Sequence, residues 1–339
     1  MAGRLKLRRG RVVATDPLEV EVDGERRRAW ADEVLLGEMR EGDEVVVNVA
    51  ALDLKLGSGG FDVVHVNLTR GLEGGGVDGA HVMKLNYTSL QHPVEPVERM
   101  QLRPPRPLTP VLVLPLHGHL APAAWAVAQA RQGVRVGYVQ TGGGALPGSL
   151  SRDVRELRER DLLAGHITAA PAYGGEYEAL TTIGAIDAAI TSLGWDTVLI
   201  GPGPGIIGSE TVYGHGGMVA LDSVHAAFGV AVPTLVSPRL SASDPRPRHR
   251  GLSHHTHTLL VQLQAPVGLP YPEEARDLLA PFEHSMHSLH PVSVDLASYR
   301  ASGLPTKTMG RDIAEDPLFF AAPLAAGTSL ARSLADQGL

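Results

Sequence analysis

Hydrophobic and polar residues alternate in short runs over the first part of the chain. Val20 and Val22 are separated by a polar residue, as in a strand with one buried face, and Val45 and Val47 show the same period. Turn residues such as those at 23–24 lie between the runs. Short strands at regular spacing predict a small antiparallel barrel. We therefore expect a β-barrel-like domain over residues 1–92, with strands at 10–14, 18–22, 26–31, 44–50 and 61–68.

From Val111 onward, apolar runs alternate with longer segments that are rich in helix-forming residues. The apolar runs cover residues 111–116, 134–139, 167–170, 198–200 and 230–236, and the helical segments between them cover 121–132, 150–163, 180–193 and 218–228. This alternation is typical of an α/β fold, a mostly parallel sheet with helices on both faces. We expect an α/β domain over residues 111–339, extended by strands near 259–263 and 292–294 and closed by helices near 273–284 and 316–334.

Prolines separate the two patterned regions. Six of them occur in residues 93–110: Pro93, Pro96, Pro104, Pro105, Pro107 and Pro110. Proline-rich segments adopt an extended, semi-rigid backbone. We therefore predict a linker over residues 93–110.

Composition narrows the class of protein. The chain has 339 residues, a formal net charge of −7 and no cysteine. The negative charge disfavours general nucleic-acid binding, which depends on clustered Lys and Arg, and the missing cysteines exclude disulfides and thiolate catalysis. No long apolar run indicates a membrane span or the core of a signal peptide. We expect a cytoplasmic protein without membrane partners, and we consider a homodimer.

Glycines follow several of the expected strands. Ligands of open parallel sheets bind beyond the carboxyl ends of the strands, and glycine lets backbone N–H groups approach a ligand closely. We expect one pocket for an anionic small molecule at that edge, lined by Gly142, Gly143, Gly144, Gly174, Gly175, Gly201, Gly203 and Gly205. Loops of α/β proteins are often rich in glycine, so a purely structural role is the alternative.

The stretch from Ser241 to His257 combines prolines, arginines and histidines after the strand at 230–236. Prolines stiffen a loop, and a stiff loop with many donors commonly carries function. Arg246 and Arg248 suit bidentate recognition of phosphate or carboxylate, although an ion-pair network that holds the loop is an equal alternative. Arg311, in a second polar loop, would close over the same anion.

The same stretch supplies the candidate acid–base groups. His254 or His255 would act as general acid or base, oriented by Asp244 or Ser243. The candidate catalytic set is His254, His255, Asp244, His249 and His117.

A metal centre is the alternative use of these histidines. His117 and His119 lie two residues apart after an expected strand, which would point both rings the same way. Further ligands would come from the histidines between His249 and His257. Loop histidines more often hydrogen-bond or transfer protons than bind a metal. We therefore assign no residue as a metal ligand and leave the cofactor open.

Four stretches together carry a family resemblance: residues 243–255, residues 142–147, the loop at 201–203 and residues 308–311. They resemble a bacterial family known only as domain-of-unknown-function family 3866, over essentially the whole chain. The resemblance includes His117, His249, His254 and His255 but neither His119 nor His257, which weakens the pair of His117 and His119 as a metal site. It implies common ancestry and no particular activity.

The function that we expect is hydrolysis or group transfer on an anionic, phosphorylated or carboxylated metabolite, because the chain carries no redox group of its own. A metal-dependent hydrolase that uses His117 with the later histidines is one alternative. A non-enzymatic ligand sensor or protein-interaction scaffold is the other.

Overall fold

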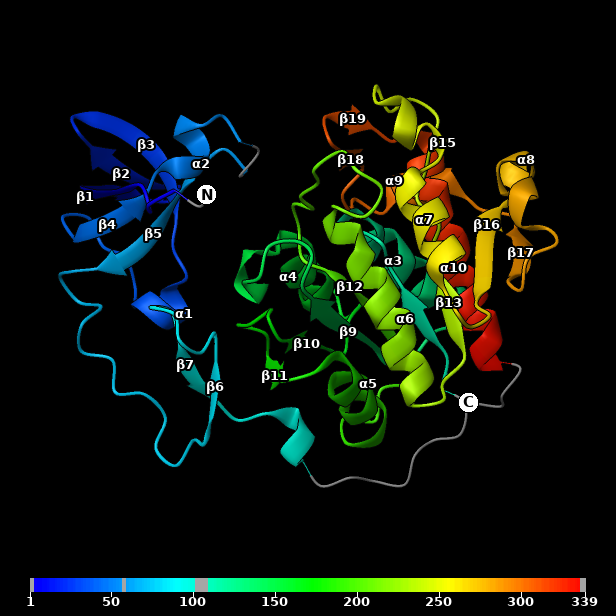
Figure 1. Cartoon of the computed structure of the whole chain (residues 1–339), viewed down its shortest axis with the longest axis horizontal. Helices are drawn as coiled ribbons and strands as arrows, with labels where there is room; N and C mark the ends of the chain where they lie inside the picture. The colour runs from blue at the N-terminus through cyan, green and yellow to red at the C-terminus, as the bar shows by residue number, and fades with distance from the viewer. Residues whose placement is uncertain (1–2, 57–58, 101–108, 336–339) are drawn as a thin grey trace. The chain divides into compact units, whose positions relative to one another are not determined.

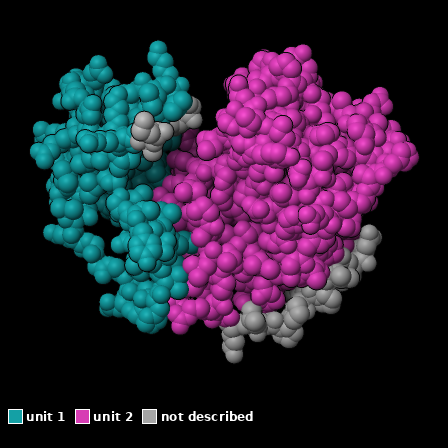
Figure 2. All heavy atoms as spheres, in the orientation of Figure 1, with its two compact units in different colours: residues 1–94 teal, residues 95–339 magenta. Residues whose placement is uncertain are grey.

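The computed structural model describes residues 3–56, 59–100 and 109–335, and they form two compact units. The first unit comprises Met1–Val94 and the second Glu95–Leu339, as coloured in Figure 2. Of the predicted linker at 93–110, residues 101–108 lie outside the described residues. Its first part is ordered, because Val97 is buried in the core of the second unit and Glu98 accepts the backbone N–H of Leu180 at 2.8 Å.

The first unit is a closed barrel of five strands in the order β1-β2-β3-β5-β4, as predicted. The strands are β1 (Leu7–Thr15), β2 (Leu18–Val22), β3 (Glu25–Trp30), β4 (Glu44–Asn48) and β5 (Asp62–Asn67). Short helices α1 (Glu33–Leu36) and α2 (Ala50–Asp53) flank β4, and the hairpin of β6 (Val82–Lys84) and β7 (His92–Val94) follows. The alternating valines fill the interior. All neighbouring strands are antiparallel except β3 and β5, which run parallel.

The second unit is built on an eight-stranded sheet in which all neighbouring strands run parallel (Figure 1). The order is β11-β10-β9-β12-β8-β13-β16-β17. The strands are β8 (Val111–Val113), β9 (Val136–Thr141), β10 (Gly165–Ala169), β11 (Tyr177–Ala179), β12 (Thr197–Pro202), β13 (Thr234–Val236), β16 (Gly268–Pro272) and β17 (Ser288–Val292). The expected α/β fold is confirmed.

Both faces of this sheet are covered, which explains why its strands are uniformly apolar. Val111 and Val113 pack with α5 (Thr182–Thr191), α6 (Val219–Gly229) and α7 (His254–Gln262) on one face. Leu112 and Leu114 pack on the other face with α3 (Leu120–Ala130), α4 (Arg152–Glu159), α9 (Leu296–Ala301) and α10 (Pro317–Ala335). The short helix α8 (Arg276–Leu279) follows β16.

Two sequence-based assignments need correction or closer definition. Residues 259–263 were expected as a strand but belong mostly to α7, which begins after the N-cap Ser253. Leu259 and Leu260 are buried in the core as part of this helix. The strand predicted at 292–294 lies earlier, as β17 (Ser288–Val292). A run of a few apolar residues does not by itself distinguish a buried strand from a buried helix turn.

Helix α10 has the length and the apolar composition of a membrane span, which we did not expect from the sequence. In the fold, 72% of its apolar window is buried. It packs against α3 so closely that a Cβ on Gly327 would lie 2.3 Å from the carbonyl oxygen of Ala123. This is the packing of a core helix.

Candidate functional site

The second unit has a cavity of about 550 Å³ beside the carboxyl ends of three adjacent strands, β12, β8 and β13. Its walls come from the segments that follow these strands and from a loop near residue 308. This is the edge at which ligands bind in open parallel sheets. The polar wall residues are His117, Glu210, Thr211, His215, Arg239, Arg246, Arg248, His249, His254, His255 and Thr308.

The segment after β13 contains most of the polar wall residues of the cavity. The short strands β14 (Leu240–Ser241) and β15 (Gly251–Leu252) pair antiparallel, so residues 242–250 form a loop between them. Helix α7 then starts directly, because Ser253 Oγ accepts the backbone N–H of His255 at 3.3 Å. His254 and His255 therefore lie in the first turn of a helix and not in a loop.

Four imidazoles form one cluster in the cavity wall. His215, from the segment before α6, stacks on His255 with ring centroids 3.6 Å apart. The ring of His254 lies 4.4 Å from that of His255, and the ring of His249 lies 4.8 Å from it. His249 Nδ1 contacts Ser253 Oγ at 2.7 Å. Two nitrogens of the cluster, His215 Nδ1 and His254 Nε2, are buried without a hydrogen-bond partner among the described residues.

Burial and neighbouring arginines keep these imidazoles uncharged. Burial, followed by the charge of Arg239, lowers the pKa of His249 to about 3. Burial and the neighbouring His215 lower the pKa of His255 to about 2. Burial also lowers the pKa values of His215 and His254. At neutral pH the cluster therefore presents nitrogen lone pairs and no positive charge.

Arginines surround the cluster and converge on one carboxylate. Asp244 is completely buried and receives a paired contact from Arg246, with two N–O distances of 2.9 Å. Arg239 lies 3.5 Å from the same carboxylate and Arg311 lies 3.4 Å from it. Arg311 also bonds Asp316 at 3.1 Å. Although burial opposes ionisation, the hydrogen bonds and charges of these arginines hold the pKa of Asp244 far below its ordinary value.

Three guanidinium groups reach the cavity itself, those of Arg239, Arg246 and Arg248. Arg239 is only 5% exposed, and burial together with the charge of Arg246 lowers its pKa to about 10, so it is still a cation at neutral pH. Arg248 pairs with Glu210 at 3.0 Å near the surface. With neutral imidazoles, the cavity wall carries more positive than negative charge.

The predicted catalytic residues lie close together, but their contacts differ from those expected. His117, His249, His254 and His255 line the cavity. Asp244 hydrogen-bonds arginines and not His254 or His255. Ser243 Oγ has no hydrogen-bond partner among the described residues, and the hydroxyl that contacts His249 belongs to Ser253.

The predicted ligand-binding residues divide into two groups. Arg246, Arg248 and Gly205 line the cavity, whereas Gly142, Gly143, Gly144, Gly174, Gly175, Gly201, Gly203, Ser243 and Arg311 are not among its wall residues. Several of these glycines let two loops approach each other. A Cβ on Gly143 would lie 2.3 Å from the carbonyl oxygen of Gly216, and one on Gly144 would lie 2.1 Å from that of Gly203.

His117 and His119 do not point the same way, because they belong to a short 3-10 helix and not to a strand end. His117 Nε2 contacts Ser151 Oγ at 2.8 Å at the cavity edge. His119 is completely buried and its Nδ1 contacts Ser237 Oγ at 2.9 Å. The two rings therefore do not form a metal-binding pair.

Sequence reasoning missed His215, Arg239 and Glu210. His215 lies in a long irregular segment between β12 and α6, where no periodic pattern marks it. Arg239 stands next to Pro238 between two apolar stretches, and its backbone N–H donates to Thr256 Oγ1 at 2.8 Å. For Arg239 the signal that was present is a charged residue shortly after a core strand, and His215 had no such signal.

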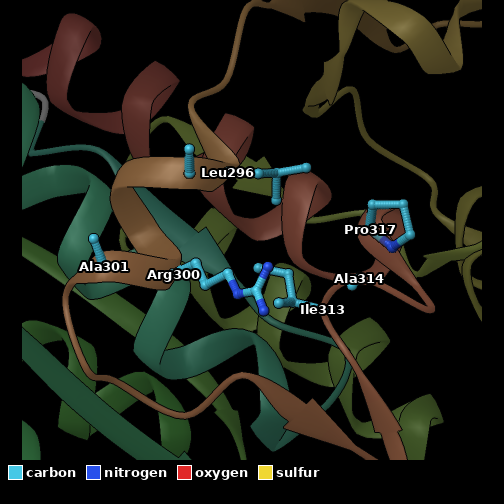
Figure 3. A pocket seen from close by; sticks show the side chains of 7 residues that line it. Leu296, Arg300, Ala301, Ile313, Ala314 and Pro317 are labelled. Atoms are coloured by element: carbon cyan, nitrogen blue, oxygen red, sulfur yellow. The ribbon is translucent and has the colours of Figure 1, made fainter.

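A second cavity, of about 470 Å³, lies between α9 and the start of α10 (Figure 3). Its wall is apolar apart from Arg300 and consists of Leu296, Ala297, Arg300, Ala301, Ile313, Ala314 and Pro317. It has no cluster of titratable groups, so the cavity beside the histidines is the candidate functional site.

Comparison with known proteins identifies a family. A family model described as "Protein of unknown function (DUF3866)" matches residues 28–327 of the chain. The matched region contains every wall residue of the histidine cavity. Neither the curated proteins nor the solved structures give a match. Because the model covers most of the chain and its whole candidate site, the protein belongs to the family of proteins of unknown function DUF3866.

Proposed function

We propose that the histidine cavity binds a small anionic molecule and that the protein hydrolyses it or transfers a group from it. The observation that carries the proposal is that Arg239, Arg246 and Arg248 share one cavity wall with uncharged imidazoles. Guanidinium groups recognise phosphate and carboxylate through paired N–H donors. The cavity volume of about 550 Å³ lies in the range of small-molecule sites.

The arginines and the imidazoles have separate roles in this proposal. Arg246 and Arg248 hold the negatively charged group of the substrate, and Arg239 adds a buried positive charge behind them. His254 and His255 face the neighbouring part of the substrate, where the bond is cleaved. In metal-free protein, replacing either histidine by glutamine should therefore abolish turnover while anion binding is retained.

Binding is tested first, with untagged full-length protein and a panel of inorganic phosphate, sulfate, phosphomonoesters and small carboxylates. A ligand at 100 times its dissociation constant adds about 2.7 kcal/mol of stability and raises the melting temperature. Arg248→Gln should weaken phosphate binding roughly 10-fold to 100-fold, because a hydrogen bond to a charged group contributes about 1.5–3 kcal/mol.

Arg250→Gln is the matched control, since Arg250 lies in the same segment, is exposed and is not a wall residue. Equal losses in both variants, or no anion binding by folded wild-type protein, would contradict the proposed site. Each ligand found is then incubated with the protein and examined for product. Tight binding without turnover would contradict an enzyme and support a ligand sensor.

A further inference from the structure

We propose that His215, His254 and His255 form a binding site for one first-row divalent metal ion, with an open coordination position toward the cavity. Among the described residues, these three are the only group of three or more potential ligands whose donor atoms all lie within 4.8 Å of one another. The metal site does not depend on the proposed function. The coupling to an anion that is described below does rest on it.

Each of the three imidazoles offers one ring nitrogen, and these nitrogens lie within 4.8 Å of one another. His215 Nε2 lies 3.1 Å from the carbonyl oxygen of Val212, so this nitrogen carries the proton and leaves His215 Nδ1 bare. Arg239 can only donate, so its contact of 3.4 Å with His255 Nδ1 marks a lone pair there, which Arg239 has to release before a metal ion can bind it. His254 Nε2 is buried and has no hydrogen-bond partner among the described residues.

A backbone contact that fixes the tautomer of a ligand is the usual support for a metal-binding histidine. The contact between His215 and Val212 has this geometry. Gly217 provides the space, because a Cβ on it would lie 3.1 Å from His215 Nδ1 and 3.2 Å from His255 Nδ1. Both nitrogens therefore lie next to a residue that has no side chain.

Coordination requires the imidazole rings to move from their present positions. Metal–nitrogen bonds of 2.0–2.1 Å in a tetrahedral site place the nitrogens about 3.4 Å apart. The three donor nitrogens now lie up to 4.8 Å apart and have to move closer together. The stacked rings of His215 and His255 also have to turn out of parallel. Three neutral imidazoles without a carboxylate suit Zn²⁺, Co²⁺, Ni²⁺ or Cu²⁺ rather than Mg²⁺ or Ca²⁺.

The charge around His215, His254 and His255 favours an anion as the fourth ligand of the metal ion. Arg239 lies against His255, and the N-terminus of α7 begins at His254, so the surroundings are positive. A cation in such a place is favoured when its remaining position holds an anion. The anion of the proposed function would occupy this position, and metal and anion would then strengthen each other's binding by the same factor.

The test is titration of metal-free, untagged full-length protein with Co²⁺, followed by calorimetry and by the visible absorption of the bound ion. We expect one Co²⁺ per chain with the intense absorption of tetrahedral coordination. His215→Gln, His254→Gln and His255→Gln should each weaken binding by roughly 100-fold or more, since loss of a supporting contact alone costs about 10-fold to 100-fold. His257→Gln is the matched control, because His257 lies on the same helix, is exposed and is not in the trio.

A second variant covers the case in which a histidine variant fails to fold. Gly217→Ala retains all three ligands but fills the space between two of them, so it should weaken Co²⁺ binding while the metal-free protein melts as the wild type does. Absence of stoichiometric Co²⁺ binding by the wild type, or an equal loss in His257→Gln, would overturn the metal site.

The two proposals fail separately. Sulfate should tighten Co²⁺ binding several-fold in the wild type and not in Arg248→Gln. Stoichiometric Co²⁺ without this coupling would support the metal site and contradict the placement of the anion. Anion binding without Co²⁺ binding would overturn the metal site and leave the proposed function in place.

Discussion

Asp43 in the barrel and Asp244 beside the cavity are both almost completely buried, and arginines keep both ionised. Their surroundings differ in charge. Asp43 contacts one arginine, Arg70, whose shortest N–O distance is 2.6 Å, and it also accepts hydrogen bonds from Asn67 Nδ2 and from the backbone N–H of Arg40. Asp244 contacts three arginines, Arg239, Arg246 and Arg311.

This difference distinguishes a structural ion pair from the wall of the proposed binding site. Around Asp43 the charges cancel and the polar groups are satisfied, as a stable fold requires. Around Asp244 the positive charges exceed the negative ones, even though Asp316 compensates part of Arg311. Two unpartnered imidazole nitrogens lie nearby. Excess charge and unsatisfied groups in this cavity support the proposal that it binds a ligand.

The largest effect is expected from Asp244→Ala. It leaves Arg239 buried without its carboxylate, and an uncompensated buried charge costs about 3–5 kcal/mol. Hydrogen exchange of the full-length protein should show lost protection in the second unit and unchanged protection in the barrel. A destabilisation below about 1 kcal/mol would mean that the arginines are not held by Asp244.

Asp43→Ala should have a smaller effect, confined to the barrel. The side chain of Arg70 is 35% exposed and can turn to water, so the main cost is the unsatisfied amide of Asn67 and backbone N–H of Arg40, about 1–3 kcal/mol. The same hydrogen-exchange experiment should show lost protection in the barrel only. Equal destabilisation by the two alanine variants would remove the contrast between the two aspartates.

The barrel aspartate also predicts a pH window. The Arg70 hydrogen bonds lower the pKa of Asp43 from 3.8 to about 2. A depressed carboxyl pKa stabilises the fold fully above the unfolded value, and this contribution is lost as the pH falls from about 4 toward 2. Barrel protection should therefore decline over this range in the wild type and decline less in Asp43→Asn. Asp23→Asn, at an exposed barrel aspartate, should follow the wild type.

The smallest effect is expected from Glu210→Gln. Glu210 pairs with Arg248 and so competes with any anion in the cavity. An exposed pair of this kind contributes at most about 1 kcal/mol, so phosphate binding should strengthen by no more than about 5-fold. The melting temperature should not change. Glu283→Gln, at an exposed glutamate elsewhere in the second unit, should leave phosphate affinity as it is.

Much of the fold was legible in the sequence because burial imposes a period on it. Val20 and Val22 alternate with polar residues since one face of β2 is inside the barrel. Val111 to Val113 are all apolar since both faces of β8 are covered. The parallel pairing of β3 with β5 was not predictable, because it joins segments about thirty residues apart through a contact that leaves no periodic mark.

The site was legible in part. The arginines and histidines between Arg246 and His255 were found because many polar side chains follow one core strand. Asp244 and Ser243 do not hydrogen-bond His254 or His255, which they were expected to orient. The partner of a side chain depends on which distant segments the fold brings next to it. The pairing of β14 with β15 brings Arg239 next to Ser253, whose backbone N–H donates to the Arg239 carbonyl at 3.0 Å.

The sequence by itself therefore determined most of the strands and helices, the edge of the sheet at which the candidate site lies and the side chains of one wall of its cavity. Periodicity and the position of a residue after a strand are local properties, so they can be recognised from the order of residues alone. Only the tertiary structure decided that His215 joins His254 and His255, that three arginines converge on Asp244 and that the glycines mostly pack loop against loop. These features depend on contacts between segments that are distant in the chain. The hydrogen bonds and charges in such contacts leave no pattern in the order of residues.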